Sequence, residues 1–423
     1  MTFSLVYPGS FVCRVLLLLA VSASVSAFEV ARPEDVGMSS ERLERLSEEL
    51  RQYVDDGRLA GGVVIVARRG KLVVHEAFGE RDAEADAPMQ EDAIFRIASQ
   101  TKAIVSTAVM ILQEEGELLI ADPVGKYLPE FMETTVAVSR DDGGYDNVAA
   151  ERPVTIRDLL THTAGFGYGT GIAGDRWEEA GIQGWYFADR DEPIGETVAR
   201  MARLPADAQP GAAWVYGYNT DILGAVVERV SGESLERFIT RRILRPLGMD
   251  DTHFYLPQDK RGRLAVVYSA TADGIVRAPA HGHDGQGAYV EGPRTSFSGG
   301  AGLLSTAGDY ARFLQMLLNG GELDGKRILG RKSVELMTVN HLGDIGFSAG
   351  EGFGLGFYIV EDLGSRGEPG SVGEYGWGGA YHTEYWVDPA EELVVVYMTQ
   401  LIPAGNMDDT KKLRALVYQA IVD

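Results

Sequence analysis

Two predicted strand pairs, one near each end of the chain, set the outline of the fold. Residues 62–75 read Gly-Val-Val-Ile-Val-Ala-Arg-Arg-Gly-Lys-Leu-Val-Val-His, which is two β-type runs around an Arg-Arg-Gly-Lys turn. A second pair covers residues 385–387 and 393–398, joined by Asp-Pro-Ala at 388–390. Strands at both ends, with mostly helical or loop-like sequence between them, predict one sheet built from both ends of the chain.

Helices are predicted on either side of these strands. Residues 40–53 place three leucines at helical spacing behind serine caps, and residues 103–112 are apolar and compatible with a helix. Residues 410–422 are helical in composition. We therefore expect a discontinuous α/β sheet domain, residues 28–120 and 291–423. A mostly helical insertion domain, residues 121–290, would interrupt it.

The composition is ordinary for a folded globular protein. Of the 423 residues, 45% are hydrophobic and 24% are charged. At about 150 residues per domain, this length suggests two or three domains or one large domain with an insertion. Lys and Arg total 39 against 62 Asp and Glu, a formal net charge of −23. Such a surface repels phosphate backbones and anionic lipid headgroups, so neither nucleic-acid nor membrane-surface binding is expected.

The N-terminus is typical of an export signal. Residues 15–23 form an apolar run behind Arg14, and Val-Ser-Ala at 25–27 fits signal-peptidase cleavage after Ala27. The run is shorter than the about 20 residues that span a membrane. We expect residues 1–27 to be a signal peptide and the protein to be periplasmic or secreted; an uncleaved anchor is the alternative. The only cysteine is Cys13, so no intrachain disulfide and no cysteine metal site are expected.

Two serine motifs compete for the role of nucleophile. The first is Ser-Gln-Thr-Lys at 99–102, the only Ser-x-x-Lys in the chain. Positions i and i+3 share one face of a helix, so Lys102 can reach the hydroxyl of Ser99. A serine hydroxyl is a poor nucleophile until a base takes its proton, and a desolvated lysine can serve as that base.

The second motif, Gly-Phe-Ser-Ala-Gly at 346–350, formally matches the nucleophile elbow of α/β-hydrolases. That elbow needs a strand before the serine and a helix after it. The segments on both sides of Ser348 are loop-like, and His382 follows too soon for the rest of such a sheet. We therefore interpret Ser348 as part of a glycine-rich loop.

The stretch Phe-Arg-Ile-Ala-Ser-Gln-Thr-Lys at 95–102 resembles the nucleophile region of serine hydrolases with the β-lactamase fold. This superfamily includes class C β-lactamases, penicillin-binding proteins, D-amino-acid peptidases and carboxylesterases, and the motifs are most similar to those of the esterases. The likeness continues at 116–129, 156–165 and 300–310. It implies an α+β fold: a mainly antiparallel sheet flanked by helices, with a helical domain forming the other wall of the active-site cleft.

The resemblance also implies a catalytic tyrosine. Tyr216 stands before Asp-Ile-Leu-Gly at 221–224, as the catalytic tyrosine does in this family. Two residues later, where the β-lactamases carry an asparagine, this chain has Tyr218, which we expect to contact the substrate.

The third family motif is altered in this chain. Where β-lactamases and penicillin-binding proteins carry Lys-Thr-Gly, residues 377–379 are Trp-Gly-Gly, followed by Ala380. Gly378 and Gly379 would let a substrate lie close to the strand, and Trp377 would form an apolar wall. The missing lysine would normally help to hold a substrate carboxylate, so its absence favours neutral esters.

Neither of two histidine motifs is interpreted as a functional site: the first is read as a structural turn and the second as a solvated loop. His162 lies in a Leu-Leu-Thr-His-Thr-Ala-Gly segment that resembles a turn of this family. His281, His283 and Asp284 form a short cluster in a predicted loop, with no further ligand signal. We expect no metal and no cofactor.

The resemblance implies that Ser99 attacks the carbonyl of a small ester or amide and forms an acyl-enzyme, which water then hydrolyses. Lys102 and Tyr216 would share the proton transfers as a coupled pair, and either could be the base. The oxyanion would lie between the backbone N–H groups of Ser99 and Ala380. The alternatives are a β-lactamase or D-amino-acid peptidase, an acyltransferase, and a catalytically inactive binding protein.

Overall fold

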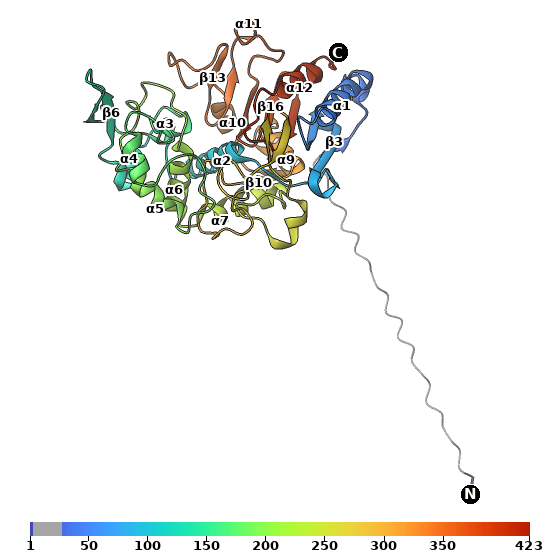
Figure 1. Ribbon diagram of the computed structural model, residues 1–423, viewed down its shortest axis with the longest axis horizontal. Coiled ribbons are helices and arrows are strands. Elements are labelled where there is room, and N and C mark those ends of the chain that lie inside the picture. The colour runs from blue at the N-terminus through green and yellow to red at the C-terminus, as the bar shows by residue number, and fades with distance from the viewer. Residues whose placement is uncertain (3–27) are drawn as a thin grey trace.

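A central sheet with helices on both faces organises the molecule (Figure 1). This computed structural model describes residues 1–2 and 28–423, so the predicted export signal lies outside the described residues. Within those residues, no helix is long and apolar enough to cross a membrane.

The two predicted strand pairs join in a single nine-stranded sheet. The first pair is β2 (Gly61–Arg68) with β3 (Lys71–Asp82), and the second is β16 (Thr383–Asp388) with β17 (Leu393–Met398). β2 and β17 lie side by side and antiparallel, with Val63 opposite Met398 and Arg68 opposite Leu393. The prediction that both ends of the chain build one sheet is confirmed.

Five further strands extend the sheet in the order β1-β3-β2-β17-β16-β15-β14-β13, with β4 paired to β3. The pairing of β1 with β3 is parallel, and the other pairs are antiparallel. The added strands are β1 (Glu29–Val30), β4 (Ala87–Pro88), β13 (Glu351–Phe353), β14 (Tyr358–Val360) and β15 (Tyr375–Gly379).

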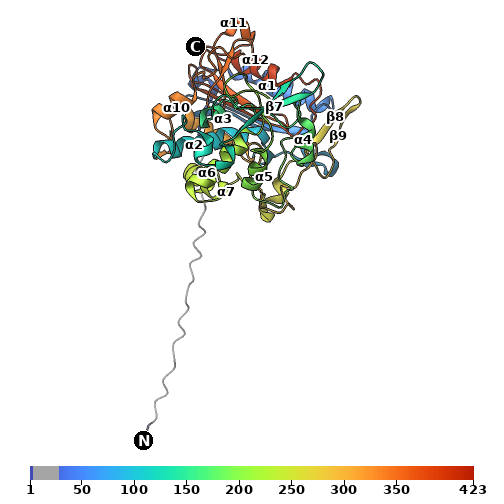
Figure 2. The same cartoon turned by 90° about the vertical axis from the view of Figure 1, so that its left-hand side faces the viewer.

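Alternate residues of the central strands pack against different helices, because successive side chains of a strand point to opposite faces. On β2, Val63 and Ile65 join the core formed with α2 (Thr101–Glu114) and α9 (Ala307–Leu318). Val64 and Val66 join the core under α1 (Ser40–Asp55) and α12 (Asp409–Tyr418). Figure 2 shows α1 and α12 together on one side of the molecule.

The helices predicted at 40–53 and 103–112 are confirmed as α1 and α2. The C-terminal helix is shorter than predicted. It ends at Tyr418 because Ile421 instead forms an antiparallel bridge with Met38, which precedes α1.

Residues 121–290 carry several helices and also two hairpins, which the sequence did not predict. The hairpins pair β6 (Thr135–Ser139) with β7 (Tyr145–Ala149) and β8 (Tyr268–Thr271) with β9 (Gly274–Arg277). The helices are α3 (Ile156–Leu160), α4 (Gly174–Glu179), α5 (Ile194–Met201), α6 (Asn219–Ser231), α7 (Leu235–Ile239) and α8 (Arg245–Leu247). Since α6 packs against α2, the helices of this part lie on the α2 side of the sheet (Figure 1). The β8–β9 hairpin differs, because Tyr268 joins the core under α1 and α12.

Shorter elements complete the described chain. They are β5 (Phe95–Arg96) paired with β10 (Leu304–Ser305), β11 (Glu322–Leu323) paired with β12 (Lys326–Arg327), α10 (Arg331–Met337) and α11 (Leu363–Arg366).

Candidate active site

Ser99 lies on a tight turn between β5 and α2. This turn is a short 3-10 helix, Ala98–Gln100, and Ala98 has a φ of 40°. Such a left-handed conformation costs a non-glycine residue about 1–3 kcal/mol and persists only where its surroundings impose it. Here the Tyr310 hydroxyl donates to the Gln100 carbonyl at 2.9 Å, and Thr101 Oγ1 accepts from the Leu303 amide at 3.0 Å. The turn thereby presents Ser99 to a pocket.

Lys102 is buried one turn further along the same face. Its side chain is 2% exposed, and Nζ donates to Ser99 Oγ at 3.2 Å. Nζ also donates to the Tyr168 hydroxyl at 3.2 Å and to the Gly300 carbonyl at 2.8 Å. All three partners are uncharged oxygen atoms. The structure therefore brings together the serine and lysine singled out by their spacing, while their chemical roles stay predictions.

A buried carboxyl group supports the loop that supplies the Gly300 carbonyl. Asp221, on α6, is 1% exposed, and its Oδ1 accepts from Ser298 Oγ at 2.6 Å and from the Gly300 amide at 3.0 Å. Burial raises the pKa of Asp221 above its usual value. A Cβ on Gly300 would lie 2.4 Å from this carboxyl group, so only glycine permits the close approach. Asp221 positions Lys102 through this loop.

Two tyrosines flank Lys102, and the sequence pointed to only one of them. The ring of Tyr216 lies with its centroid 4.6 Å from Lys102 Nζ, and its hydroxyl accepts from Trp377 Nε1 at 3.1 Å. Tyr168 instead brings its hydroxyl to Nζ. Burial, with Tyr216 and Asp221 nearby, raises the pKa of Tyr168 well above its usual value, so its phenol stays protonated. Tyr168 sits between two glycines in a loop, and no motif marks it.

Tyr218, which the resemblance placed at the substrate, does not line the pocket. It is fully buried, stacks on Trp177 and donates from its hydroxyl to the Tyr168 carbonyl at 3.2 Å. Because it directly precedes the first residue of α6, its side chain turns into the helical core. Tyr218 therefore supports the loop that carries Tyr168 and does not contact the pocket.

The Trp-Gly-Gly segment forms the end of β15 and lies directly beside the Ser99 turn. Trp377 packs against Tyr216, with ring centroids 5.4 Å apart. A Cβ on Gly379 would lie 2.4 Å from the Ile97 carbonyl oxygen, so a side chain here would push the strand away from the turn. The backbone N–H groups of Ser99 and Ala380 have no hydrogen-bond acceptor within residues 28–423. Both donors are therefore free to bind an oxyanion.

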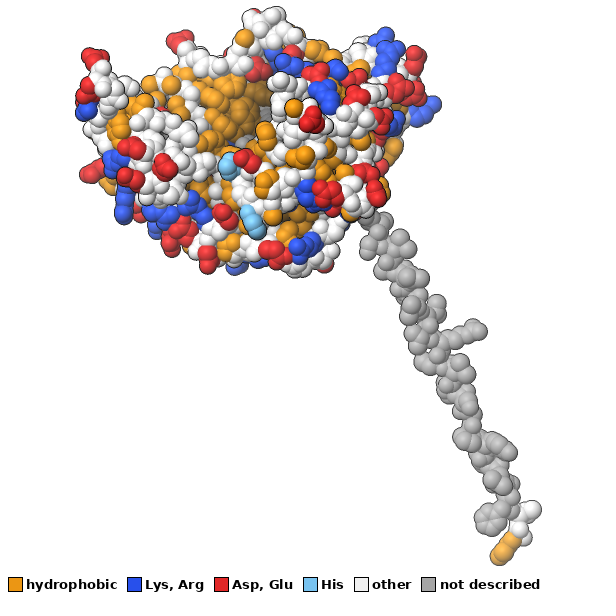
Figure 3. All heavy atoms as spheres, in the orientation of Figure 1, with side chains coloured by type: hydrophobic (Ala, Val, Ile, Leu, Met, Phe, Trp, Pro, Cys, Tyr) orange, Lys and Arg blue, Asp and Glu red, His pale blue; other side chains and the backbone are white. Residues whose placement is uncertain are grey.

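Ser99 lines a pocket of about 490 Å³. Its lining includes Ser99, Tyr168 and Tyr216 together with the end of β15, and Trp185 adds a further aromatic surface. A hollow lined by hydrophobic side chains is visible between the part of the chain carrying α3 and the part carrying β13 (Figure 3).

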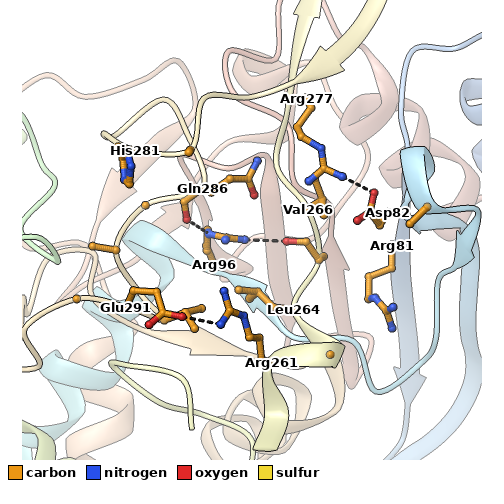
Figure 4. Close-up of a pocket in the computed structure, with 18 of the residues that line it drawn as sticks. Arg81, Asp82, Arg96, Arg261, Leu264, Val266, Arg277, His281, Gln286 and Glu291 are labelled. Atoms are coloured by element: carbon orange, nitrogen blue, oxygen red, sulfur yellow. Dashed lines mark hydrogen bonds and ion pairs between the residues drawn. The ribbon is translucent and has the colours of Figure 1, made fainter. Parts of the chain in front are cut away.

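A second pocket, of about 670 Å³, does not include Ser99. Figure 4 shows two arginines of this pocket in ion pairs with acidic side chains: Arg261 pairs with Glu291, and Arg277 pairs with Asp82. His281 lines this pocket. Within the described residues, no group of three or more His, Cys, Asp or Glu side chains could hold a metal ion.

Two further residues weighed in the sequence, His162 and Ser348, do not line the Ser99 pocket. His162 sits in a turn with a φ of 57°, is 1% exposed, and its Nδ1 lies 2.9 Å from Asn219 Nδ2. Burial, with the charge of Lys102, lowers the pKa of His162 well below its usual value. Ser348 is exposed on a loop, and the next element is the strand β13, so the geometry is not that of a nucleophile elbow.

Comparison with known proteins agrees with this fold. Residues 46–419 match the family described as Beta-lactamase. The chain is 34% identical over 390 residues to Esterase EstB of Burkholderia gladioli, covering 88% of this chain and 94% of that protein. It is 32% identical over 300 residues to lovastatin esterase of Penicillium rubens (strain ATCC 28089 / DSM 1075 / NRRL 1951 / Wisconsin 54-1255), covering 69% and 71%.

Among solved structures, EstCE1, a hydrolase with promiscuous acyltransferase activity, matches with a TM-score of 0.76 and 28% identity, covering 89% of this chain and 98% of that chain. The chain belongs to the beta-lactamase family. It is a serine hydrolase of the β-lactamase and penicillin-binding-protein superfamily, related to esterases. The α+β fold expected from the resemblance is confirmed.

Proposed function

We propose that this protein is an exported carboxylesterase that cleaves small neutral esters through a Ser99 acyl-enzyme. The observation that carries the proposal is the buried Lys102 amine, 3.2 Å from the hydroxyl of a serine presented to a pocket. Export is supported by the apolar run behind Arg14 and the Val-Ser-Ala sequence before residue 28.

In the proposed reaction, the Lys102 amine accepts the proton of Ser99 as Oγ attacks the carbonyl carbon of the ester. The carbonyl oxygen becomes an oxyanion and accepts hydrogen bonds from the N–H groups of Ser99 and Ala380. When the tetrahedral intermediate collapses, the C–O bond to the alcohol breaks, and the alcohol leaves with a proton from Lys102, relayed by Tyr216. A water molecule then attacks the acyl-enzyme, and the same groups return Ser99 to its starting state.

The chemistry of the pocket supports esters over carboxylate-bearing substrates. Within the described residues, no lysine or arginine lines this pocket to hold a substrate carboxylate. His382 does line it, but its ring is already paired with Asp409. Trp377, Tyr216 and Trp185 offer aromatic surface, which suits an apolar acyl or alcohol group. The relatives named as esterases support the same substrate class.

Paired substrates test this function. We expect kcat/KM for p-nitrophenyl butyrate to exceed that for the β-lactam nitrocefin by at least about a hundredfold, because the pocket leaves the β-lactam carboxylate without a cationic partner. Both rates are read by absorbance on the same preparation, with Ser99→Ala as the blank. Preferred turnover of nitrocefin would assign the protein to the β-lactamases instead.

The structural match to EstCE1, whose description includes acyltransferase activity, favours one further assay. Addition of an acceptor alcohol to the ester reaction, with product analysis by mass spectrometry, separates hydrolysis from acyl transfer. Free acid as the main product supports the esterase; a new ester as the main product identifies an acyltransferase.

A further inference from the structure

Glu384 lines the same pocket as Ser99, on the strand next to the one that would bind the substrate. On β16 it is directly opposite Gly378 of β15, and residues paired in this way present their side chains on the same face. A Cβ on Gly378 would lie 3.3 Å from Glu384 Oε2. Because glycine has no side chain, the pocket continues past the strand and is lined by both Ser99 and Glu384.

This part of β15 is an open edge of the sheet. β14 pairs with β15 only at Tyr375 and Gly376, so the segment from Trp377 to Gly379 has a partner strand on one side alone. A substrate lying along this free edge passes Gly378, and therefore passes the Glu384 carboxyl group.

The charged side chains that face Glu384 are themselves paired with other groups. They are His382 before β16, Arg414 on α12, Arg366 on α11 and Glu368 in the loop that follows. His382 Nε2 lies 2.9 Å from the Asp409 carboxylate, and Arg414 and Arg366 both pair with the buried Glu374. Within residues 28–423, no side chain forms an ion pair with the Glu384 carboxylate, so its charge acts on the contents of the pocket.

We propose that Glu384 is a specificity-determining residue, which disfavours substrates that carry a negative charge near Gly378 and favours neutral or cationic ones. The inference rests on the proposed esterase function and identifies the substrate class that this site accepts. Like charges brought together in a partly desolvated pocket repel strongly, whereas a cationic group there would gain an otherwise unpaired carboxylate partner.

This selection depends on pH. Burial raises the pKa of Glu384 to about 7, above the usual value of a glutamate. Above pH 7 the carboxyl group is ionised and repels an anionic substrate; below pH 7 it is protonated and the repulsion is lost. Discrimination against anions therefore grows as the pH rises through about 7.

Two series of esters test this inference, since either the acyl or the alcohol part could lie beside Gly378. One series compares p-nitrophenyl butyrate with its 4-sulfo and 4-trimethylammonio derivatives. The other compares phenyl, sulfophenyl and trimethylammoniophenyl butyrates. The sulfonate and the quaternary ammonium keep their charges at every pH used. kcat/KM for each charged ester is measured at pH 6 and pH 8.5 and divided by kcat/KM for the neutral ester of the same series. The measurements are made on the wild type, on Glu384→Gln and on the exposed control Glu48→Gln.

At pH 8.5 we expect Glu384→Gln to raise the anionic-to-neutral ratio about tenfold in one series and to lower the cationic-to-neutral ratio. Glu48→Gln, which removes the same charge from the exposed face of α1, should change neither ratio. The wild-type ratio should itself fall between pH 6 and pH 8.5, a readout that does not depend on the folding of a variant.

Three results are distinguishable. Ratios that follow these expectations support the role of Glu384. If the esters are turned over but the charged-to-neutral ratios of kcat/KM change neither in Glu384→Gln nor with pH, this inference is wrong. The proposed esterase function would then still stand. A wild type that turns over no ester in either series would overturn the proposed function and this inference with it.

Discussion

Replacement of Lys102 by alanine is expected to lower kcat/KM for a p-nitrophenyl ester by at least about a thousandfold while leaving the protein folded. Lys102 is the only side chain hydrogen-bonded to Ser99 Oγ within the described residues, so its loss leaves the hydroxyl without a base. The variant also loses the contacts to Tyr168 and Gly300, but none of the three acceptors left without Lys102 is charged.

Steady-state kinetics and thermal unfolding followed by circular dichroism test this expectation on the same preparations. Lys326→Ala is the matched control, because Lys326 is exposed on β12 and should lose neither activity nor stability. A folded Lys102→Ala protein with near wild-type turnover would contradict the proposed mechanism.

Replacement of each of the two tyrosines beside Lys102 by phenylalanine is expected to lower kcat/KM by different amounts. Tyr216→Phe should lower kcat/KM about a hundredfold or more, which is the range for loss of a proton-transfer group. Tyr168→Phe should cost only about tenfold, because its phenol stays protonated and serves to hold the Lys102 amine through one hydrogen bond.

The comparison between these two variants decides which phenol takes part in proton transfer. Both remove one oxygen from an aromatic ring that lines the same pocket, so each serves as the packing control for the other. Stopped-flow measurement of acyl-enzyme formation separates an effect on Ser99 activation from one on deacylation. A larger loss in Tyr168→Phe than in Tyr216→Phe would transfer the proton-relay role to Tyr168.

Much of the fold could be predicted because the apolar patterns of the sequence are strong. The side chains of β2 and β17 are buried on both faces of the sheet. Their sequences are therefore continuously apolar, without the alternation of apolar and polar residues seen in half-exposed strands. Ser99 and Lys102 could be predicted as a pair because their i, i+3 spacing is a local property of the helix start.

The remaining features depend on long-range packing, which local patterns do not contain. Tyr168 reaches Lys102 only through the path of a glycine-rich loop, and Tyr218 turns inward because α6 begins directly after it. Glu384 gains its position from the register of β16 against β15, where Gly378 stands opposite. These placements arise from tertiary structure, so neither the resemblance nor residue spacing could supply them.

Covalent labelling shows directly whether Ser99 is an activated nucleophile. The purified protein is exposed to a fluorophosphonate, its intact mass is measured, and the modified residue is identified by peptide mapping. We expect a single adduct on Ser99 that is absent from Lys102→Ala, since the phosphonate reacts only with a serine whose proton a base removes. An adduct on Ser348, or no adduct on the folded wild type, would contradict it.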